Sequence, residues 1–102
     1  MSKLFWKKRN KNKLVYLVHD EANDCYFEYQ FEKNIDLNCK NGEYILPDPN
    51  GPRHIYGTDN NQKTHLIVID QNTYFEVVSI NHQKARDGQQ EKVYFLSLKR
   101  SA

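Results

Sequence analysis

The chain is predicted to adopt a mainly β or α+β fold, in which two similar β-rich motifs pack about a pseudo-twofold axis around one core. The first observation is a repeated triplet, Tyr26-Phe27-Glu28 and Tyr74-Phe75-Glu76, each preceded by an apolar run and a turn. The second is a similar distance to a later aromatic-aliphatic run, 44 − 26 = 18 residues to Tyr44 and 94 − 74 = 20 residues to Tyr94. Because the chain has only 102 residues, neither motif can bury a core alone, and the two are expected to share one.

The first motif is expected to span residues 14–46, with strands over 14–19, 25–32 and 43–46. The middle strand carries the clearest signal, because apolar and polar residues alternate strictly along it. In that alternation Cys25, Phe27, Tyr29 and Phe31 share one face, so this face should pack inward and the other should meet solvent or a partner.

Residues 47–63 are predicted to be a linker, because all three prolines fall there and proline and glycine interrupt regular structure. The second motif is expected over residues 64–100, with strands at 64–70, 73–80 and 91–99. Residues 73–80 also fit a helix start, since Thr73 and Glu76 match a capping box, but β-branched and aromatic residues favour a strand. The residues expected in the shared core are Phe27, Phe31, Leu66, Val68, Phe75, Val93 and Phe95.

Charge is distributed unevenly along the chain. Residues 1–13 form a basic arm of charge +6, so the remainder carries 2 − 6 = −4. Such an arm suits nucleic acid, where its lysines would meet phosphates and an aromatic pair would stack on bases. The same composition also suits an anionic membrane surface or a solubilising terminus. The candidate nucleic-acid-binding residues are Lys3, Lys7, Lys8, Arg9, Lys11 and Lys13.

Several classes of protein are disfavoured by what the sequence lacks. The basic start is not followed by the apolar stretch of roughly 7–15 residues that a secretory signal needs, and no apolar run approaches the roughly 18 residues of a membrane span. A cytoplasmic protein without a membrane span is therefore expected. Cys25 and Cys39 are expected to be free thiols, although a single bridge between them is left open.

No metal, cofactor or catalytic site is predicted. The four histidines, His19, His54, His65 and His82, are scattered rather than placed at ligand spacing on one element. The carboxylates Asp48, Asp70 and Glu76 loosely match a magnesium-dependent nuclease, but Val78 stands where that pattern needs a lysine. Glu28 and Glu76 lack any feature that would set two carboxylate pKa values apart for acid–base catalysis. The chain is therefore expected not to be an enzyme.

The most promising candidate site is a groove between the two motifs. Tyr26, Glu28, Tyr74 and Glu76 occupy matching positions on the non-core face, and an extended peptide packed between sheet edges suits such a surface. A connecting loop between the motifs adds residue types that often carry binding energy, and its candidates are Arg53, His54 and Tyr56. The alternatives left open are ordinary solvent-facing sheet residues for the first group and a plain tether between the motifs for the loop.

The paired triplets and the chain length resemble the small proteins of filamentous viruses that infect heat-loving archaea, such as the Acidianus filamentous viruses, over roughly residues 14–99. The resemblance implies a virus-encoded protein that works in the host cytoplasm or the virion, with no enzymatic precedent. The leading hypothesis is a non-enzymatic protein–protein interaction module, monomeric or homodimeric, that binds a peptide or partner chain between its motifs. The alternative is a nucleic-acid-binding protein that uses the basic arm.

Overall fold

The structure, a computed structural model, describes residues 13–32 and 34–101. Within these ranges the fold is all-β, with seven strands and no helix, so none of the described residues forms a helix long and apolar enough to cross a membrane. The strands are β1 (Lys13–Asp20), β2 (Cys25–Tyr29), β3 (Tyr44–Ile45), β4 (His54–Asp59), β5 (Thr64–Val68), β6 (Thr73–Lys84) and β7 (Gln90–Arg100).

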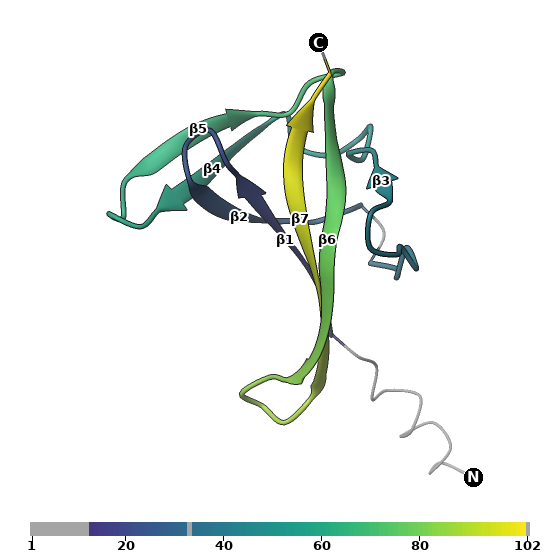
Figure 1. The fold of residues 1–102 in the computed structure, drawn as a ribbon. Helices are drawn as coiled ribbons and strands as arrows, with labels where there is room; N and C mark the ends of the chain where they lie inside the picture. The colour runs from purple at the N-terminus through teal and green to yellow at the C-terminus, as the bar shows by residue number, and fades with distance from the viewer. Residues whose placement is uncertain (1–12, 33, 102) are drawn as a thin grey trace, which may run out of the picture.

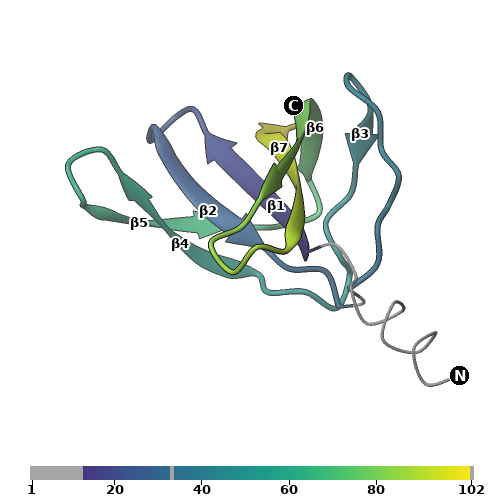
Figure 2. The same ribbon diagram turned by 90° about the horizontal axis from the view of Figure 1, so that it is seen from below.

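The strands form one curled sheet in the order β3-β6-β7-β1-β2-β4-β5. Neighbouring strands are antiparallel except β1 and β7, which run parallel, so the sheet is mixed. Figures 1 and 2 show the sheet bent into a half-barrel, with the β4–β5 hairpin at one side and β3 at the other. Among the described residues no further strand pairs with β3 or β5, so the two ends of the sheet are free strand edges there.

The core lies on the inner, concave face of the sheet. Alternation along each strand sends one set of side chains inward, as predicted for Cys25, Phe27 and Tyr29, which are all buried. The aromatic ring of Tyr29 meets that of Phe75 at 5.1 Å between centroids, so β2 and β6 contact each other across the concave face. The other buried members of the core cluster are Tyr16, Val18, Cys39, Ile67, Ile69, Val77, Tyr94, Leu96 and Leu98.

The predicted core needs correction at β5. Leu66 and Val68 are 52% and 40% exposed, whereas Ile67 and Ile69 are almost fully buried. The apolar run therefore alternates between faces instead of being buried on both. Since β5 is the last strand of the sheet and pairs only with β4, the described residues place no second layer over its outer face.

The remaining core predictions are met in part. Phe27 and Phe75 are buried in the core, and Phe31 is half-buried against it. Val93 is also buried, but it does not belong to the core cluster, because it lies on the face of β7 opposite to Tyr94. Phe95 points outward on β7, and Tyr94 of the same strand takes the inward position. A continuous apolar run does not reveal whether its odd-numbered or its even-numbered side chains face the core. The pairing of β7 with β1 and β6 decides which set does.

The predicted linker over residues 47–63 is wrong in its second half, where β4 forms. The prolines end at residue 52, and His54 to Asp59 then alternates in exposure as an edge-region strand does. Gly57 interrupts the pattern for a steric reason: a Cβ there would lie 2.9 Å from both Cys25 Sγ and Ile67 Cδ1. This glycine thus allows β4 to approach the core closely.

Residues 73–80 are a strand, as predicted, and β6 continues to Lys84. The register between β6 and β7 shifts between Val77 and Ser79, which leaves Val78 as the extra residue of a bulge, 57% exposed. Cys25 and Cys39 are both free and buried, so the alternative of a bridge between them is not realised.

Candidate functional site

A group of hollows surrounds Leu46, the residue directly after the edge strand β3. Leu46 is 74% exposed, and the exposed apolar side chains of Leu37 and Tyr44 line the same hollow, so the three form an apolar patch. Leu46 lines three separate hollows, which share this residue as their common rim. We call this region the Leu46 surface.

The largest hollow of the Leu46 surface has a volume of about 620 Å³ and a mostly apolar lining. Cys39 and Ile45 lie toward the core, and Leu37 and Leu46 are exposed at the rim. A volume of this size is within the range of sites that take small ligands or several side chains. The other lining residues are Phe31, Glu43, Tyr44, Pro47, Asp48 and Pro49.

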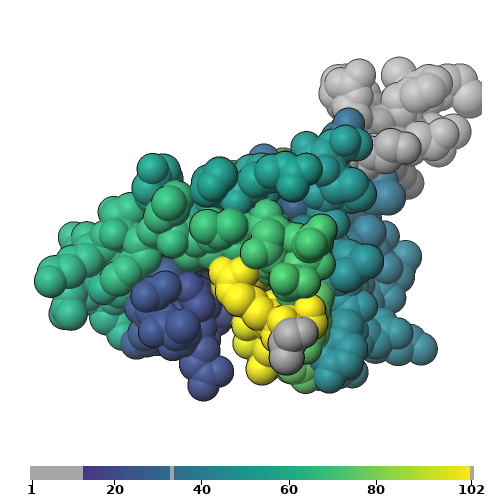
Figure 3. Space-filling view, turned by 90° about the horizontal axis from the view of Figure 1, so that it is seen from above, coloured from purple at the N-terminus to yellow at the C-terminus, as the bar shows by residue number. Residues whose placement is uncertain are grey.

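The other two hollows lie where the two sequence motifs meet. One, of about 370 Å³, is lined by Tyr44 and Leu46 from the first motif and by Gln71 to Tyr74 from the second. Tyr44 and Tyr74 pack edge to face at 5.3 Å between ring centroids. The third, of about 340 Å³, reaches Arg53 in the connecting segment. Figure 3 shows this end of the molecule from above, with the green surface of β6 beside the yellow C-terminal strand; β3 lies on the other side of β6.

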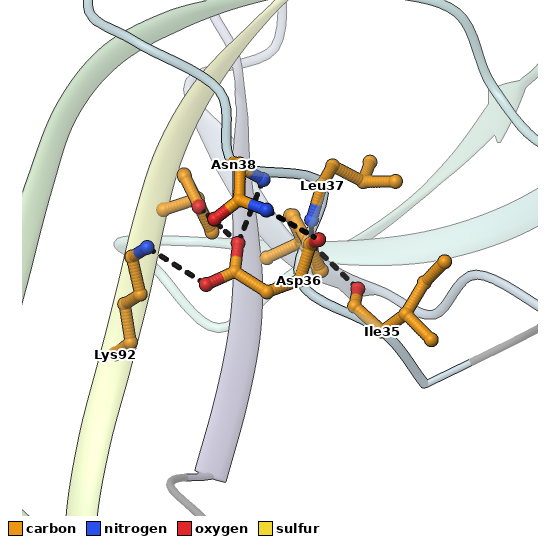
Figure 4. Close-up of polar contacts among 7 residues, drawn as sticks. Ile35, Asp36, Leu37, Asn38 and Lys92 are labelled. Carbon is orange, nitrogen blue, oxygen red and sulfur yellow. Dashed lines mark hydrogen bonds and ion pairs between the residues drawn. The ribbon is translucent and has the colours of Figure 1, made fainter.

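Asp36 fixes the loop that forms one wall of the large hollow. Lys92 Nζ donates to Asp36 Oδ2 at 2.8 Å. Asp36 Oδ1 accepts from the Tyr94 hydroxyl and, at 2.8 Å, from the backbone N–H of Asn38. Figure 4 shows the carboxylate of Asp36 between Lys92 of β7 and the loop backbone. One carboxylate thus ties the loop to the sheet.

Tyr16 of β1 anchors the same loop through its hydroxyl. This group donates to the Ile35 carbonyl and accepts from the Leu37 amide, both at 3.2 Å. The ring of Tyr16 stacks on that of Tyr94, with 4.9 Å between centroids. The Tyr16 hydroxyl therefore holds the backbone at the residues directly before and after Asp36.

The electrostatics around Asp36 favour an ionised Asp36 carboxylate paired with a protonated Lys92. Burial, the largest single influence, raises the pKa of Asp36, but the hydrogen bonds from Lys92, Tyr94 and Asn38 together lower it below its ordinary value of 3.8. The hydrogen bond to Asp36 raises the pKa of Lys92. Burial and the bond to Asp36 raise the pKa of Tyr94, which keeps this hydroxyl protonated as a donor. The arrangement has the chemistry of a structural anchor.

Asp48 fixes the opposite wall. Its amide donates to the Tyr29 hydroxyl at 2.8 Å, and its carboxylate accepts from the amides of Glu32 and Asn50. These backbone bonds lower the pKa of Asp48. Gly51 completes the turn, because a Cβ there would lie 2.6 Å from the Tyr29 hydroxyl oxygen. The proline-rich segment is therefore seated on the core.

The free edge of β3 runs along these hollows. Val77 bonds to the backbone of Gly42 and Glu43, with N···O distances of 2.8 and 2.9 Å. Tyr44, one residue further and opposite Glu76, then occupies a position where the N–H and C=O point away from β6. Within residues 13–32 and 34–101 no other strand pairs with this side of β3, so these groups can bond to another extended chain.

The residues predicted to line one groove are divided between two places. Tyr26 and Glu28 lie on the outer face of β2, and Tyr74 and Glu76 lie on the outer face of β6. Strands β7 and β1 stand between them, a separation of about 14 Å at the usual spacing of neighbouring strands. The four therefore do not face one another, because the parallel β1–β7 pair joins the motifs.

Each of these residues has its own neighbours. Tyr74 lines the Leu46 surface, and Glu76 forms an ion pair with Lys99 at 3.8 Å. Tyr26 stacks on His19 at 4.5 Å between ring centroids. Glu28 lines a separate hollow that opens where β2 and β4 stop pairing after Tyr26–Thr58.

The loop residues are also divided. Arg53 lines the third hollow of the Leu46 surface, whereas His54 and Tyr56 lie exposed on the outer face of β4. Of the basic arm only Lys13 belongs to the described residues, as the exposed first residue of β1. The predicted nucleic-acid contacts at Lys3, Lys7, Lys8, Arg9 and Lys11 lie outside them.

Within residues 13–32 and 34–101, no three His, Cys, Asp or Glu side chains gather closely enough to hold a metal ion. The chemistry of the Leu46 surface is instead that of apolar packing beside backbone donors and acceptors. Sequence reasoning missed Leu37 and Leu46. The signal available was the run Tyr44-Ile45-Leu46 directly before proline, since proline ends the strand and leaves its last apolar side chain at a free edge.

No family model, no curated protein and no solved structure matches this chain.

Proposed function

We propose that this protein is a non-enzymatic protein–protein interaction module that binds an extended peptide or partner chain at the Leu46 surface, between its two motifs. The observation that carries the proposal is the coincidence of a free strand edge at Tyr44 with apolar hollows beside it. Strand addition needs both features, because backbone hydrogen bonds supply affinity and side-chain pockets supply specificity.

The placement of the hollows suits the alternation of a β-strand. Successive side chains of an added strand point to opposite faces of the sheet. The hollow beside Tyr74 and the large hollow beside Cys39 share Tyr44 and Leu46 and extend from them in different directions. A peptide with apolar residues at two successive positions would fill both, and Leu46 would pack between them.

We further propose, as a separate point, that the two motifs arose by internal duplication. In both triplets the phenylalanine is buried, at Phe27 and Phe75, while the preceding tyrosine lies on the outer face. This agreement supports a common origin of the two motifs. We also propose, from the resemblance noted above, that an archaeal virus encodes the chain and that it acts in the host cytoplasm or the virion. The peptide-binding proposal does not depend on either point.

The test is selection of a linear peptide from a displayed library, followed by titration calorimetry. Leu46→Ser and Tyr74→Ala should each weaken binding of the selected peptide about tenfold or more, a loss of about 1.4 kcal/mol. Leu46→Ser should leave the fold intact, because substitutions of exposed side chains usually change stability by less than about 0.5 kcal/mol.

Tyr26→Ala is the matched control, since Tyr26 is an exposed tyrosine of the same sheet that lines none of the three hollows. It should bind the peptide as the unaltered chain does. Equal affinity for all four proteins would contradict the proposal. Tight binding to nucleic acid with a steep salt dependence, lost when the chain starts at Leu14, would favour the basic arm instead.

A further inference from the structure

The other free edge of the sheet belongs to β5, and its backbone groups can be assigned from the pairing with β4. Asp59 N donates to the Lys63 carbonyl at 3.0 Å, and Ile69 N donates to the Arg53 carbonyl at 2.8 Å. Because bonded and non-bonded pairs alternate in an antiparallel ladder, odd-numbered residues of β5 bond to β4. The N–H and C=O groups of Thr64, Leu66 and Val68 therefore point away from the sheet.

One of these outward groups is already engaged. Arg100 Nη2 donates to the Val68 carbonyl at 2.9 Å, and Arg100 Nη1 donates to Thr73 Oγ1 at 3.0 Å. The guanidinium thus covers the C-terminal end of the edge. The donors and acceptors of Thr64 and Leu66 remain open beside it.

The side chains next to this edge are apolar and uncovered. On the outer face Leu66 lies opposite Tyr56, and these residues are 52% and 70% exposed. Natural edge strands usually avoid association through proline, bulges or charged residues. The strand Thr64–Val68 contains no proline, no carboxylate and no lysine, and its pairing with β4 shows no register shift.

We infer that β5 pairs with β5 of a second copy of this chain, in an antiparallel arrangement about a twofold axis. The edge is self-complementary, because the same residues carry both free donors and free acceptors. Equivalent Leu66 and Tyr56 side chains would continue the apolar outer face across the junction. A five-residue strand buries less surface than the roughly 1,200 Å² of a stable dimer, so the association is weak and depends on concentration.

Arg100 selects the register of this pair. If Leu66 lay opposite Leu66 of the second copy, Thr64 would lie opposite Val68 of that copy. The Thr64 N–H would then have to donate to a Val68 carbonyl that already accepts from Arg100. With Thr64 opposite Leu66 of the second copy, every open group of these two residues finds a partner. That register places His65 opposite its own equivalent at a non-bonded position, where Cα atoms are only about 4.5 Å apart.

Sedimentation equilibrium of the full chain tests the association. The weight-average mass should rise from that of one chain toward that of two with increasing concentration. Leu66→Pro should abolish the rise, because it removes an outward N–H without breaking the ladder to β4. Tyr44→Pro, the same change at the β3 edge, should leave it unaltered. A mass that stays at one chain, or a rise that Leu66→Pro leaves unchanged, would overturn the inference.

Disulfide trapping tests the register without depending on the proline variant. His65→Cys should form a crosslinked dimer under mild oxidation, because the non-bonded pair satisfies the distance that a disulfide requires. Leu66→Cys should crosslink far less. The unaltered chain, whose two cysteines Cys25 and Cys39 are buried, gives the background level of crosslinking. Stronger crosslinking through Leu66→Cys would contradict the register. Since this edge is separate from the Leu46 surface, loss of peptide binding and loss of self-association are distinguishable.

Discussion

At the scale of single residues, Asp36 holds together segments that are far apart in the sequence. Its partners Lys92 and Tyr94 lie 56 and 58 residues further along the chain. Nothing in the local sequence around Asp36 distinguishes it from the other acidic residues of polar loops. Its importance arises only when β7 passes beside the loop, which is why sequence reasoning did not single it out.

Replacing this carboxylate should destabilise the protein. Asp36→Asn is expected to lower the free energy of unfolding by about 1–3 kcal/mol, because Lys92 and Tyr94 lose a charged acceptor in a partly buried site. Denaturant unfolding measures the effect. Glu76→Gln is the matched control, since its ion pair with Lys99 is longer and more exposed, and surface pairs contribute about 0–1 kcal/mol.

The same contribution should depend on pH in a defined direction. The pKa of Asp36 is lowered on folding, so its stabilising effect is fully present above its ordinary value of 3.8 and is lost as the pH falls through the lower folded value. Unfolding midpoints measured from neutral pH into this acidic range should fall less steeply for Asp36→Asn than for the unaltered chain. Parallel curves would show that Asp36 does not carry this dependence.

At the scale of secondary-structure elements, periodicity predicted most strands and failed where other constraints intervene. The alternation over 25–32 correctly assigned the buried face of β2, although the strand ends at Tyr29. The strand β4 was missed because a glycine and nearby prolines indicate a linker. Gly57 is needed there for close packing, a tertiary requirement that composition alone does not reveal.

Gly57→Ala should therefore destabilise the sheet by about 1–3 kcal/mol, through overlap of the new methyl group with Cys25 Sγ and Ile67 Cδ1. Thermal or denaturant unfolding gives the value. In a Cys25→Ala background the cost of the same substitution should be smaller, because one of the two overlapping atoms is removed. An equal cost in both backgrounds would show that the strand is strained for another reason.

At the scale of the whole molecule, the half-barrel is an open sheet with a different free edge at each end (Figure 1). The β3 edge is short and lies among hollows, which suits an extended peptide. The β5 edge is longer, flanked by exposed apolar side chains, and closed at one end by Arg100, which suits a second copy. Five strands separate the two edges.

The two edges should therefore act independently. Leu66→Pro is expected to leave peptide affinity within about twofold, and Leu46→Ser is expected to leave self-association unchanged, because sites more than about 10 Å apart without shared partners are usually additive. Calorimetry and sedimentation on both variants and on their combination measure this. A coupling above about 1 kcal/mol would show that the curled sheet transmits strain between its edges.

The sequence by itself determined the β-rich class, the approximate positions of six strands, the inward face of β2 and the strand character of residues 73–80. These follow from local alternation and residue type, which each segment carries in its own composition. Only the tertiary structure decided that β1 and β7 pair in parallel, that Ile67 rather than Leu66 faces the core, and that Tyr26 lies far from Tyr74. Strand order and inward parity depend on contacts between distant segments, and those contacts also place the Leu46 surface and the two free edges.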